Sequence, residues 1–283
     1  MTVIEIPAPD FDLEKTLNSG QVFHWEAVGT IFIGTIGDVS IQIRQENQTL
    51  FVKGGIPNLP ETVRHYFALD HPLSDICQSF PNDPVMNAAA DYCRGLRIIR
   101  QPKWECLATF ICSSMKQVAH IRQISRSLRE RFGEPRRING KVLHTFPTAE
   151  RLARSSEKEL RECALGYRAK NLLATARLVS SSQANPEEWL NLSDADLMAR
   201  LCALPGVGPK VANCVMLFAF ERLRAFPIDV WIERVLRQQY FRGKRKPTTA
   251  KLRAFSADYF GQHGGYAQQY LFHHARTAAG RGK

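Results

Sequence analysis

The stretch Leu204-Pro205-Gly206-Val207-Gly208-Pro209-Lys210 decides the fold. Ser193 can cap a helix that precedes it, and Pro209 is favoured in the first turn of a helix that follows it. Gly206 and Gly208 let the turn between the two helices pass close to another surface with its amides exposed. Amides at the positive end of a helix bind phosphate without reading a base sequence. Residues 193–220 are therefore predicted to form a helical hairpin that binds phosphate. The alternative is an ordinary pair of antiparallel helices in which the glycines only allow tight packing.

A carboxylate follows the hairpin. An apolar helix over 211–220 leads to a proline-containing loop that ends at Asp229, 19 residues after Lys210. This layout resembles the helix-hairpin-helix of DNA base-excision glycosylases, and the resemblance implies cleavage of an N-glycosidic bond, which develops positive charge on the deoxyribose. A carboxylate about 4 Å away stabilises that charge by on the order of 4 kcal/mol at an effective dielectric of ~20. The simpler role of Asp229 is to cap the next helix, over 230–240.

Lys210 is a candidate nucleophile. A lysine amine can attack the anomeric carbon of the sugar and leave as a Schiff base, which permits strand scission by β-elimination. An ordinary lysine is protonated at neutral pH, so the site must favour the neutral amine, and the positive end of the helix that begins at Pro209 gives a reason. The alternative is that Lys210 only contacts a phosphate beside the hairpin.

The charge of the chain favours a polyanionic partner. The formal net charge is +11 with a pI near 9.5, and residues 201–283 hold 14 basic against 4 acidic side chains. This distribution is typical of nucleic-acid-binding proteins, although an anionic membrane surface attracts the same charge. The apolar runs are too short to span a membrane, and the N-terminus lacks the pattern of a signal peptide. We expect an intracellular protein, in the cytoplasm or nucleoid, or in the nucleus of a eukaryote.

The seven cysteines are scattered and form no CxxC pair. This spacing argues against a disulfide framework and against a zinc or iron–sulfur site. We therefore expect no metal and no cofactor in the reaction.

Hydrophobic periodicity predicts strands first and helices later. Apolar residues alternate near 31–33 and 39–43, and a short apolar run follows at 50–52, so the first ~55 residues are expected to form an antiparallel meander. From Glu61 the period becomes helical, and one long helical pattern runs from Trp104 to Phe132. Further helices are expected over 84–96, 148–155, 157–164 and 168–181. The fold class is α+β, with a β-rich domain and helical connection at 1–100 and a helical catalytic domain at 101–283.

Five separated strings resemble the 8-oxoguanine DNA glycosylase family, within the helix-hairpin-helix glycosylase superfamily. They span the chain from about Phe11 to Phe272, and are Ser19-Gly20-Gln21-Val22-Phe23-His24-Trp25, Glu105-Cys106-Leu107 with Phe110-Ile111-Cys112-Ser113-Ser114, Leu165-Gly166-Tyr167-Arg168-Ala169, the hairpin, and Gly265-Tyr266-Ala267-Gln268-Gln269-Tyr270-Leu271-Phe272. The resemblance implies an N-terminal twisted antiparallel sheet, similar to that of the TATA-binding protein, on a helical body. It also implies excision of 8-oxoguanine from duplex DNA through a Schiff base on Lys210, with Asp229 as its electrostatic partner and β-elimination at the abasic site.

The resemblance also assigns a pocket for the flipped base. Oxidised guanine carries an N7–H donor where guanine has an acceptor, and the family's backbone carbonyl that favours the donor belongs to Gly20 here. Cys214 and Phe272 are expected to sandwich the ring, and Gln268 to bond its Watson–Crick edge. Core packing is the alternative for the two sandwiching residues. Two further residues of the first string, Gln21 and Phe23, are assigned to the same pocket.

This chain departs from the family where the family contacts the strand opposite the lesion. Tyr167 and Arg168 match the family's wedge tyrosine and one of its two arginines, but the second arginine position holds His120. The family's asparagines are replaced by Met115, Lys116 and Gln117. Elsewhere, a histidine that usually follows the family's catalytic Asp-Val is Trp231 here, so we expect one phosphate contact to be lost or replaced. The residues assigned to DNA are Met115, Lys116, Gln117, His120, Tyr167, Arg168, Gly206, Gly208, Val230 and Trp231.

Two other functions remain open on the sequence alone. One is a monofunctional glycosylase for alkylated bases, in which Lys210 takes no part, and the other is a non-catalytic helix-hairpin-helix protein that only binds DNA. Reductive trapping separates them, because only a Schiff-base enzyme becomes covalently attached to its substrate. The expected partner is double-stranded DNA that contains 8-oxoguanine. We expect the protein to bind it as a monomer and not to associate with a membrane.

Overall fold

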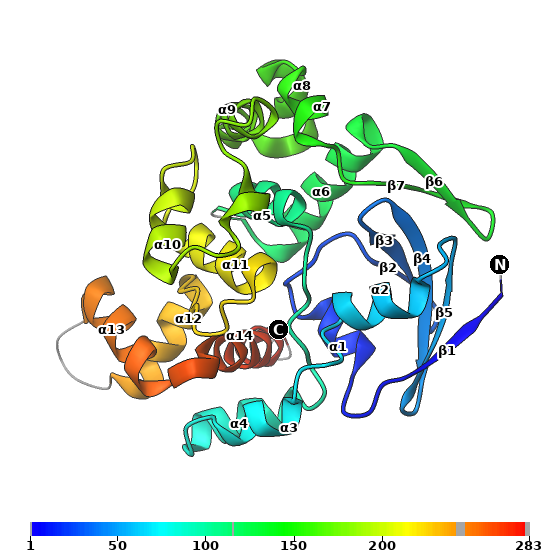
Figure 1. The fold of residues 1–283 in the computed structure, drawn as a ribbon. Coiled ribbons are helices and arrows are strands. Elements are labelled where there is room, and N and C mark those ends of the chain that lie inside the picture. The colour runs from blue at the N-terminus through cyan, green and yellow to red at the C-terminus, as the bar shows by residue number, and fades with distance from the viewer. Residues whose placement is uncertain (1, 115, 242–246, 281–283) are drawn as a thin grey trace.

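The N-terminal part of the computed structural model is an antiparallel sheet, as predicted (Figure 1). The structure describes residues 2–114, 116–241 and 247–280. The strand order is β1-β5-β4-β3-β2, so sequence neighbours pair except that the first strand joins the edge beside the last. The strands are β1 (Ile4–Pro7), β2 (Glu26–Val28), β3 (Ile31–Ile36), β4 (Val39–Glu46) and β5 (Thr49–Gly54).

One face of this sheet is covered by two helices. The inward side chains Ile41, Ile43, Leu50 and Val52 are fully buried, because alternate residues of β4 and β5 point to the same face. They share a core with residues of α1 (Leu13–Asn18) and α2 (Leu59–Tyr66). Helix α1 was not predicted. It is short and receives its stability from this tertiary packing rather than from a long periodic pattern.

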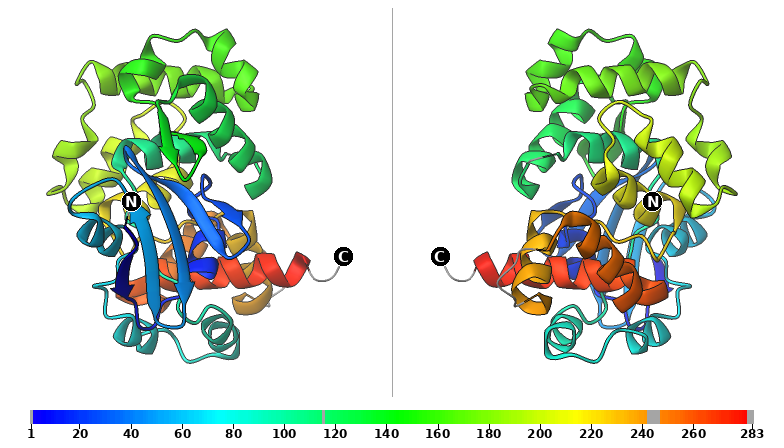
Figure 2. Two further views of the ribbon diagram at one scale, coloured as in Figure 1. Left: turned by 90° about the vertical axis from the view of Figure 1, so that its right-hand side faces the viewer. Right: turned by 90° about the vertical axis from the view of Figure 1, so that its left-hand side faces the viewer.

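The rest of the chain forms a helical body with its own core. Figure 2 shows the strands together on one side of the molecule, with α7–α9 (green) at one end, α3 and α4 (cyan) at the other, and α14 (red) running across between them. The helices are α3 (Leu73–Gln78), α4 (Pro84–Tyr92), α5 (Lys103–Cys112), α6 (Val118–Phe132), α7 (Ala149–Ala153), α8 (Glu157–Leu160), α9 (Arg168–Ser180), α10 (Asp194–Cys202), α11 (Pro209–Phe220), α12 (Val230–Val235), α13 (Thr249–Tyr259) and α14 (Gly264–Gly280).

The single helical pattern expected from Trp104 to Phe132 is in fact two helices. Helix α5 ends at Cys112, where the Ser113 hydroxyl donates to the Phe110 carbonyl at 2.7 Å and replaces a helical bond. Helix α6 begins at Val118, after Gln117 with an extended backbone. The apolar spacing continues across the break because both helices bury one face in the same core.

A short hairpin after α6 was also missed. Strands β6 (Pro135–Ile138) and β7 (Lys141–His144) are joined by Asn139-Gly140, both with positive φ. An Asn-Gly pair between short strands is a hairpin signal that the sequence does contain.

Buried charges join the sheet to the helical body. Arg129 of α6 donates to the carboxylate of Glu105 in α5 and to the Thr35 hydroxyl of β3, the latter at 2.9 Å. The His24 ring lies 3.3 Å from Glu105, and burial, followed by the charge of Arg129, lowers the pKa of His24. Neutral His24 and the Arg129–Glu105 pair therefore link three elements that are distant in sequence.

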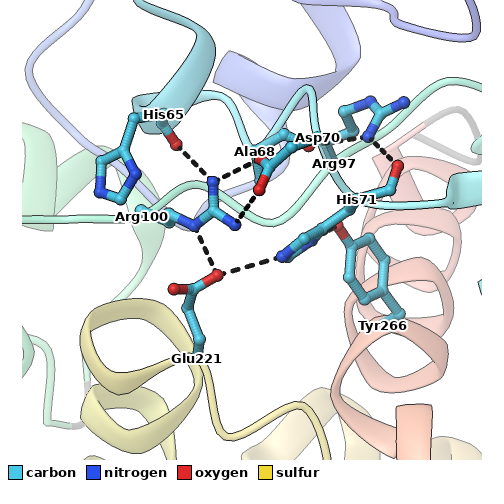
Figure 3. A network of polar contacts seen from close by, with 8 residues as sticks. All are labelled: His65, Ala68, Asp70, His71, Arg97, Arg100, Glu221 and Tyr266. Atoms are coloured by element: carbon cyan, nitrogen blue, oxygen red, sulfur yellow. Dashed lines mark hydrogen bonds and ion pairs between the residues drawn. The ribbon is translucent and has the colours of Figure 1, made fainter. Parts of the chain in front are cut away.

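A second network fixes the far end of α11 against α14 (Figure 3). Glu221, which follows α11 with a φ of 52°, lies 3.0 Å from one ring nitrogen of His71, and the other nitrogen lies 2.8 Å from the Tyr266 hydroxyl of α14. Arg100 donates to Glu221 and forms two bonds with Asp70. The bond with His71, then that with Arg100, lowers the pKa of Glu221 to about 2, and Arg100 lowers the pKa of Asp70 to about 2.

We expect Glu221→Gln to lower the thermal stability at pH 7 by about 1 kcal/mol, since the carboxylate is partly exposed and screened. A depressed folded-state pKa stabilises the fold above the ordinary pKa of about 4.3, and this contribution disappears as the pH falls toward 2. The difference in melting temperature between variant and wild type should therefore shrink between pH 5 and pH 3. Glu130→Gln, which removes an exposed helical pair with Arg126, is the control and should change stability by only a few tenths of a kcal/mol. A difference that does not depend on pH would contradict the role of the carboxylate.

Candidate active site

The predicted hairpin is present, and its turn packs against helix α9. Ser193 caps α10 through the Asp196 amide, and α11 begins at Pro209. Gly206 has a φ of 81°, and a Cβ there would lie 2.8 Å from the Cβ of Asn171 in α9. A Cβ on Gly208 would meet nothing within 4 Å among the described residues. The turn therefore packs on α9 through one glycine and presents open backbone through the other.

Lys210 lies in the first turn of α11 and points into the helical body. Its Nζ donates to the Ser113 hydroxyl at 3.2 Å and lies 5.2 Å from the centre of the Phe110 ring. The side chain is half-buried, and both contacts come from the end of α5. The amine is therefore held in one place by a neutral partner and an aromatic ring.

Asp229 caps α12, as its position before that helix predicted. Its Oδ1 accepts from the Ile232 amide at 2.9 Å. Burial raises the pKa of Asp229, while the Ile232 amide and the charge of Lys210 oppose the shift. The loop that leads to it is tied to α11, because the Phe226 amide donates to Asn213 Oδ1 at 3.2 Å. The charge of Lys210 acts on Asp229, so the two side chains lie near each other in the helical body.

Cys214 lies one turn after Lys210 on α11 and is buried. Burial raises the pKa of the Cys214 thiol, and the nearby Lys210 opposes this. The charge of Asp229 also acts on it, so the three groups share one environment. A protonated thiol offers a small apolar surface, which suits one side of a base pocket.

Gly20 and Phe272 meet although they are distant in the chain. Gly20 has a φ of 88°, and a Cβ there would lie 3.1 Å from Cε1 of Phe272. The turn is held to α14 by Gln269, whose amide donates to the Ser19 carbonyl at 3.1 Å. Gln268, one turn before Phe272, is 4% exposed, and its Oε1 has no hydrogen-bond partner among the described residues. A buried acceptor without a partner is costly, so it favours a ligand that donates.

The structure corrects two of the base-pocket assignments. The Gln21 side chain is fully buried, and its amide is satisfied internally: it donates to the Arg97 carbonyl at 2.8 Å and accepts from the Ile99 amide at 2.7 Å. Phe23 belongs to the core of the helical body, where its ring meets that of Phe110 edge-on at 6.1 Å. Gln21 therefore holds the Gly20 turn, and Phe23 supports the ring under Lys210.

A third assignment differs from expectation. The guanidinium of Arg168 is 5% exposed and donates to the carbonyls of Ser114, at 2.7 Å from Nε, and of Leu165, at 3.3 Å. It was expected to contact DNA, but here it fixes the segment after α5 to the start of α9. Tyr167, which it stacks on at 4.3 Å, is 56% exposed. An exposed tyrosine ring on a rigid segment is suited to wedge between stacked bases of the DNA.

The other residues assigned to DNA that the structure describes are exposed or half-buried. Val230 is 72% exposed, and Trp231 is half-buried under the guanidinium of Arg234 at 5.2 Å. Gln117 and His120 are exposed at the start of α6, where Lys116 is half-buried. Met115 lies outside the described residues.

Neither a metal cluster nor a membrane-spanning helix is evident in the part of the chain that the structure describes. Its residues contain no group of three or more His, Cys, Asp or Glu side chains placed to hold a metal ion. None of the helices there is long and apolar enough to cross a membrane.

Sequence reasoning missed several residues that complete the site. Ser113, which holds Lys210, was quoted in a string but given no role. Asn213, which positions the Asp229 loop, lies on a predicted helix, and Gln269, which holds the Gly20 turn, was quoted in a string without a role. Their distant partners could not be inferred from local spacing. Arg276 contacts the Gly20 turn and was not considered.

Two family models together cover most of the chain. Residues 3–107 match the N-terminal domain of 8-oxoguanine DNA glycosylase, and residues 108–260 match the HhH-GPD superfamily of base excision DNA repair proteins.

Individual relatives agree with these matches. The N-glycosylase/DNA lyase OGG1 of Arabidopsis thaliana is 32% identical over 95% of this chain and 78% of its own length. The solved structure of MBOgg1 in complex with a low-affinity DNA ligand has a TM-score of 0.94 at 32% identity, covering 99% of this chain and 97% of that one. The Clostridium acetobutylicum 8-oxoguanine glycosylase/lyase, bound to duplex DNA with cytosine opposite 8-oxoG, has a TM-score of 0.91 at 28% identity, covering 99% of both chains. The chain therefore belongs to the 8-oxoguanine DNA glycosylase family of the HhH-GPD superfamily of base excision DNA repair proteins.

Proposed function

We propose that this chain excises 8-oxoguanine from duplex DNA and then cleaves the strand at the abasic site through a Schiff base on Lys210. The observation that carries the proposal is the position of the Lys210 amine, 3.2 Å from Ser113 Oγ, near the Cys214 thiol and within range of the charge of Asp229. A lysine that only bound phosphate would extend toward solvent, whereas this one points into the body toward a half-buried carboxylate. The enzyme acts as a monomer on DNA inside the cell.

The reaction needs only groups that the site holds. The neutral amine of Lys210 attacks C1′ of the sugar, the C1′–N9 bond breaks, and the base leaves with the electron pair and takes up a proton. The new ammonium gives a proton to O4′ as the C1′–O4′ bond breaks, which leaves a hydroxyl on C4′ and a protonated C1′=N Schiff base. Loss of a C2′ proton then expels the 3′ phosphate, and water releases the lysine. The Asp229 carboxylate stabilises the positive charge on the sugar during the first step.

Lesion choice rests on the pocket formed by Gly20, Phe272, Cys214 and Gln268. The Gly20 carbonyl favours the N7–H that only the oxidised base carries, and Phe272 and Cys214 enclose the ring. The partnerless Oε1 of Gln268 suits the donors on the Watson–Crick edge of guanine. Gly206 and Gly208 bring the hairpin amides to the phosphate backbone.

Reductive trapping tests the central claim. With borohydride and duplex DNA containing 8-oxoguanine, the wild type should become covalently attached, and Lys210→Gln should not, because only the lysine forms the Schiff base. Lys158→Gln, at an exposed position of α8, is the matched control and should trap like the wild type. Excision without trapping would support the monofunctional alternative, and binding without excision would support the non-catalytic one.

Asp229→Asn should separate catalysis from stability. Asparagine keeps the acceptor for the Ile232 amide, so α12 remains capped. Because burial raises the folded-state pKa of Asp229, its charge costs stability at neutral pH, and the variant should be as stable as the wild type or more so. Excision should fall by about 10³-fold, the equivalent of about 4 kcal/mol of lost charge stabilisation. The wild-type rate should also fall at low pH as the carboxylate protonates, and a variant with full activity would refute the role.

The base opposite the lesion should be poorly discriminated. The two positions that the family uses for arginines hold His120 and an Arg168 whose guanidinium is bonded inside the protein. A neutral histidine offers one donor where arginine offers a fork. Excision rates opposite C, A, G and T should lie within about tenfold of one another, and His120→Arg should shift the preference toward C. A strict requirement for C in the wild type would contradict this.

A further inference from the structure

Arg276 lies beside Gly20 and Phe272, two of the residues proposed to enclose the flipped base. It is one turn after Phe272 on α14, and its guanidinium carbon is 5.5 Å from the centre of the Phe272 ring. Its Nη1 lies 3.1 Å from the position that a Cβ on Gly20 would take. Its Nη2 donates to the carbonyl of Asn18, at the end of α1. The side chain therefore reaches from α14 to the turn that carries Gly20 and is fixed there.

A second arginine meets it at the same residue. Arg122 of α6 donates from Nη2 to the Asn18 side-chain oxygen at 3.0 Å. Burial lowers the pKa of Arg276, the charge of Arg122 lowers it further, and Tyr92 and Asp229 oppose the shift. Among the described residues neither arginine has a carboxylate within 4.0 Å. The repulsion between the two positive charges raises the free energy of this arrangement. An anion from outside the chain would reduce that repulsion.

The position of Arg276 indicates which anion this is. It lies beside the pocket for the base, and Asp229, which faces the sugar, is near enough for its charge to act on the guanidinium. The part of the extruded nucleotide that is anionic is its phosphate, and the fork of an arginine matches phosphate oxygens. Helix α12, which carries Trp231 where the family resemblance implied a histidine that contacts phosphate, packs against α14 (Figure 1).

We propose that Arg276, held by Asn18 and reinforced by Arg122, binds a backbone phosphate of the extruded nucleotide. This inference rests on the proposed function for the location of the nucleotide. Arg276 is the contact residue, and Arg122 is a positioning residue that acts through Asn18 and adds positive potential. The pair supplies the phosphate contact that Trp231 cannot make, since an indole offers one neutral donor.

The test measures binding rather than chemistry. Duplex DNA with a tetrahydrofuran abasic-site analogue binds without reaction, so the outcome does not depend on whether the wild type excises 8-oxoguanine. Arg276→Met should weaken binding by about 10- to 100-fold, the range for one charge-assisted hydrogen bond or fork. It should also reduce the slope of log affinity against log salt concentration by about 1. Arg276→Lys, which keeps the charge without the fork, should recover part of the loss.

A neutral methylphosphonate placed 5′ or 3′ of the analogue identifies the phosphate. At the contacted position it should weaken the wild type as much as the Arg276→Met substitution does, and it should weaken that variant no further. Arg122→Met should show a smaller loss of the same kind. Arg126→Met is the control, because Arg126 lies on the same helix but is exposed and paired with Glu130, and it should change affinity less than twofold.

Two results would overturn the proposal. One is an unchanged salt slope for Arg276→Met together with unchanged affinity of Arg276→Met and Arg276→Lys for the analogue DNA, with any loss confined to DNA that carries 8-oxoguanine, which would mean that Arg276 reads the base. The other is a methylphosphonate effect of equal size in wild type and Arg276→Met at both positions. Thermal melting of each variant shows whether it folds, and Arg276→Lys keeps the test valid if the methionine variant does not.

Discussion

The chemistry of this protein depends on the fixed position of helix α11. The helix carries Lys210 at its first turn and Cys214 one turn later, and most of its side chains are buried, so it cannot turn or slide without opening the core. Its start is held by the packing of Gly206 on Asn171 and by the bond from Thr175 to the Pro205 carbonyl at 3.0 Å. Its end is held by Glu221. The position of the Lys210 amine is precise because both ends of its helix are anchored.

The base pocket depends on a second constraint, the contact between the N-terminal turn and the C-terminal helix. Gly20 and Phe272 belong to opposite ends of the chain, and the bond from Gln269 to Ser19 spans 250 positions. The N-terminal sheet matters to catalysis for this reason. The buried link through Arg129 and Glu105 keeps the sheet on the helical body. The segment that carries Gly20 connects α1 to strand β2 of this sheet, so its position depends on that link.

Several polar groups around the site are less satisfied than stability alone would favour. Gln268 has a buried oxygen with no partner among the described residues, and Arg122 and Arg276 meet beside Asn18. Asp229 is held where burial raises its pKa. Such conflicts between local cost and global fold concentrate at functional sites, because the missing partner is the ligand. Here they fall among the residues proposed to bind the extruded nucleotide.

The sequence by itself determined what depends on local chemistry. The turn with Gly206 and Gly208, the caps at Ser193 and Asp229, and the alternating strands are specified by residues near one another in the chain, so each was predictable. The Asn139-Gly140 hairpin was equally local and was overlooked. The five strings also sufficed to recognise the family.

Only the tertiary structure decided which way a side chain points and what satisfies it. Gln21 stands beside Gly20 in the sequence, yet it turns inward because Arg97 and Ile99 offer backbone partners there. Arg168 turns to the Ser114 carbonyl for the same reason. The break after Cys112 interrupts a periodicity that continues unchanged on both sides. For both side chains the deciding partner is far away in the chain, and local spacing holds no information about contacts that form only when distant segments pack together.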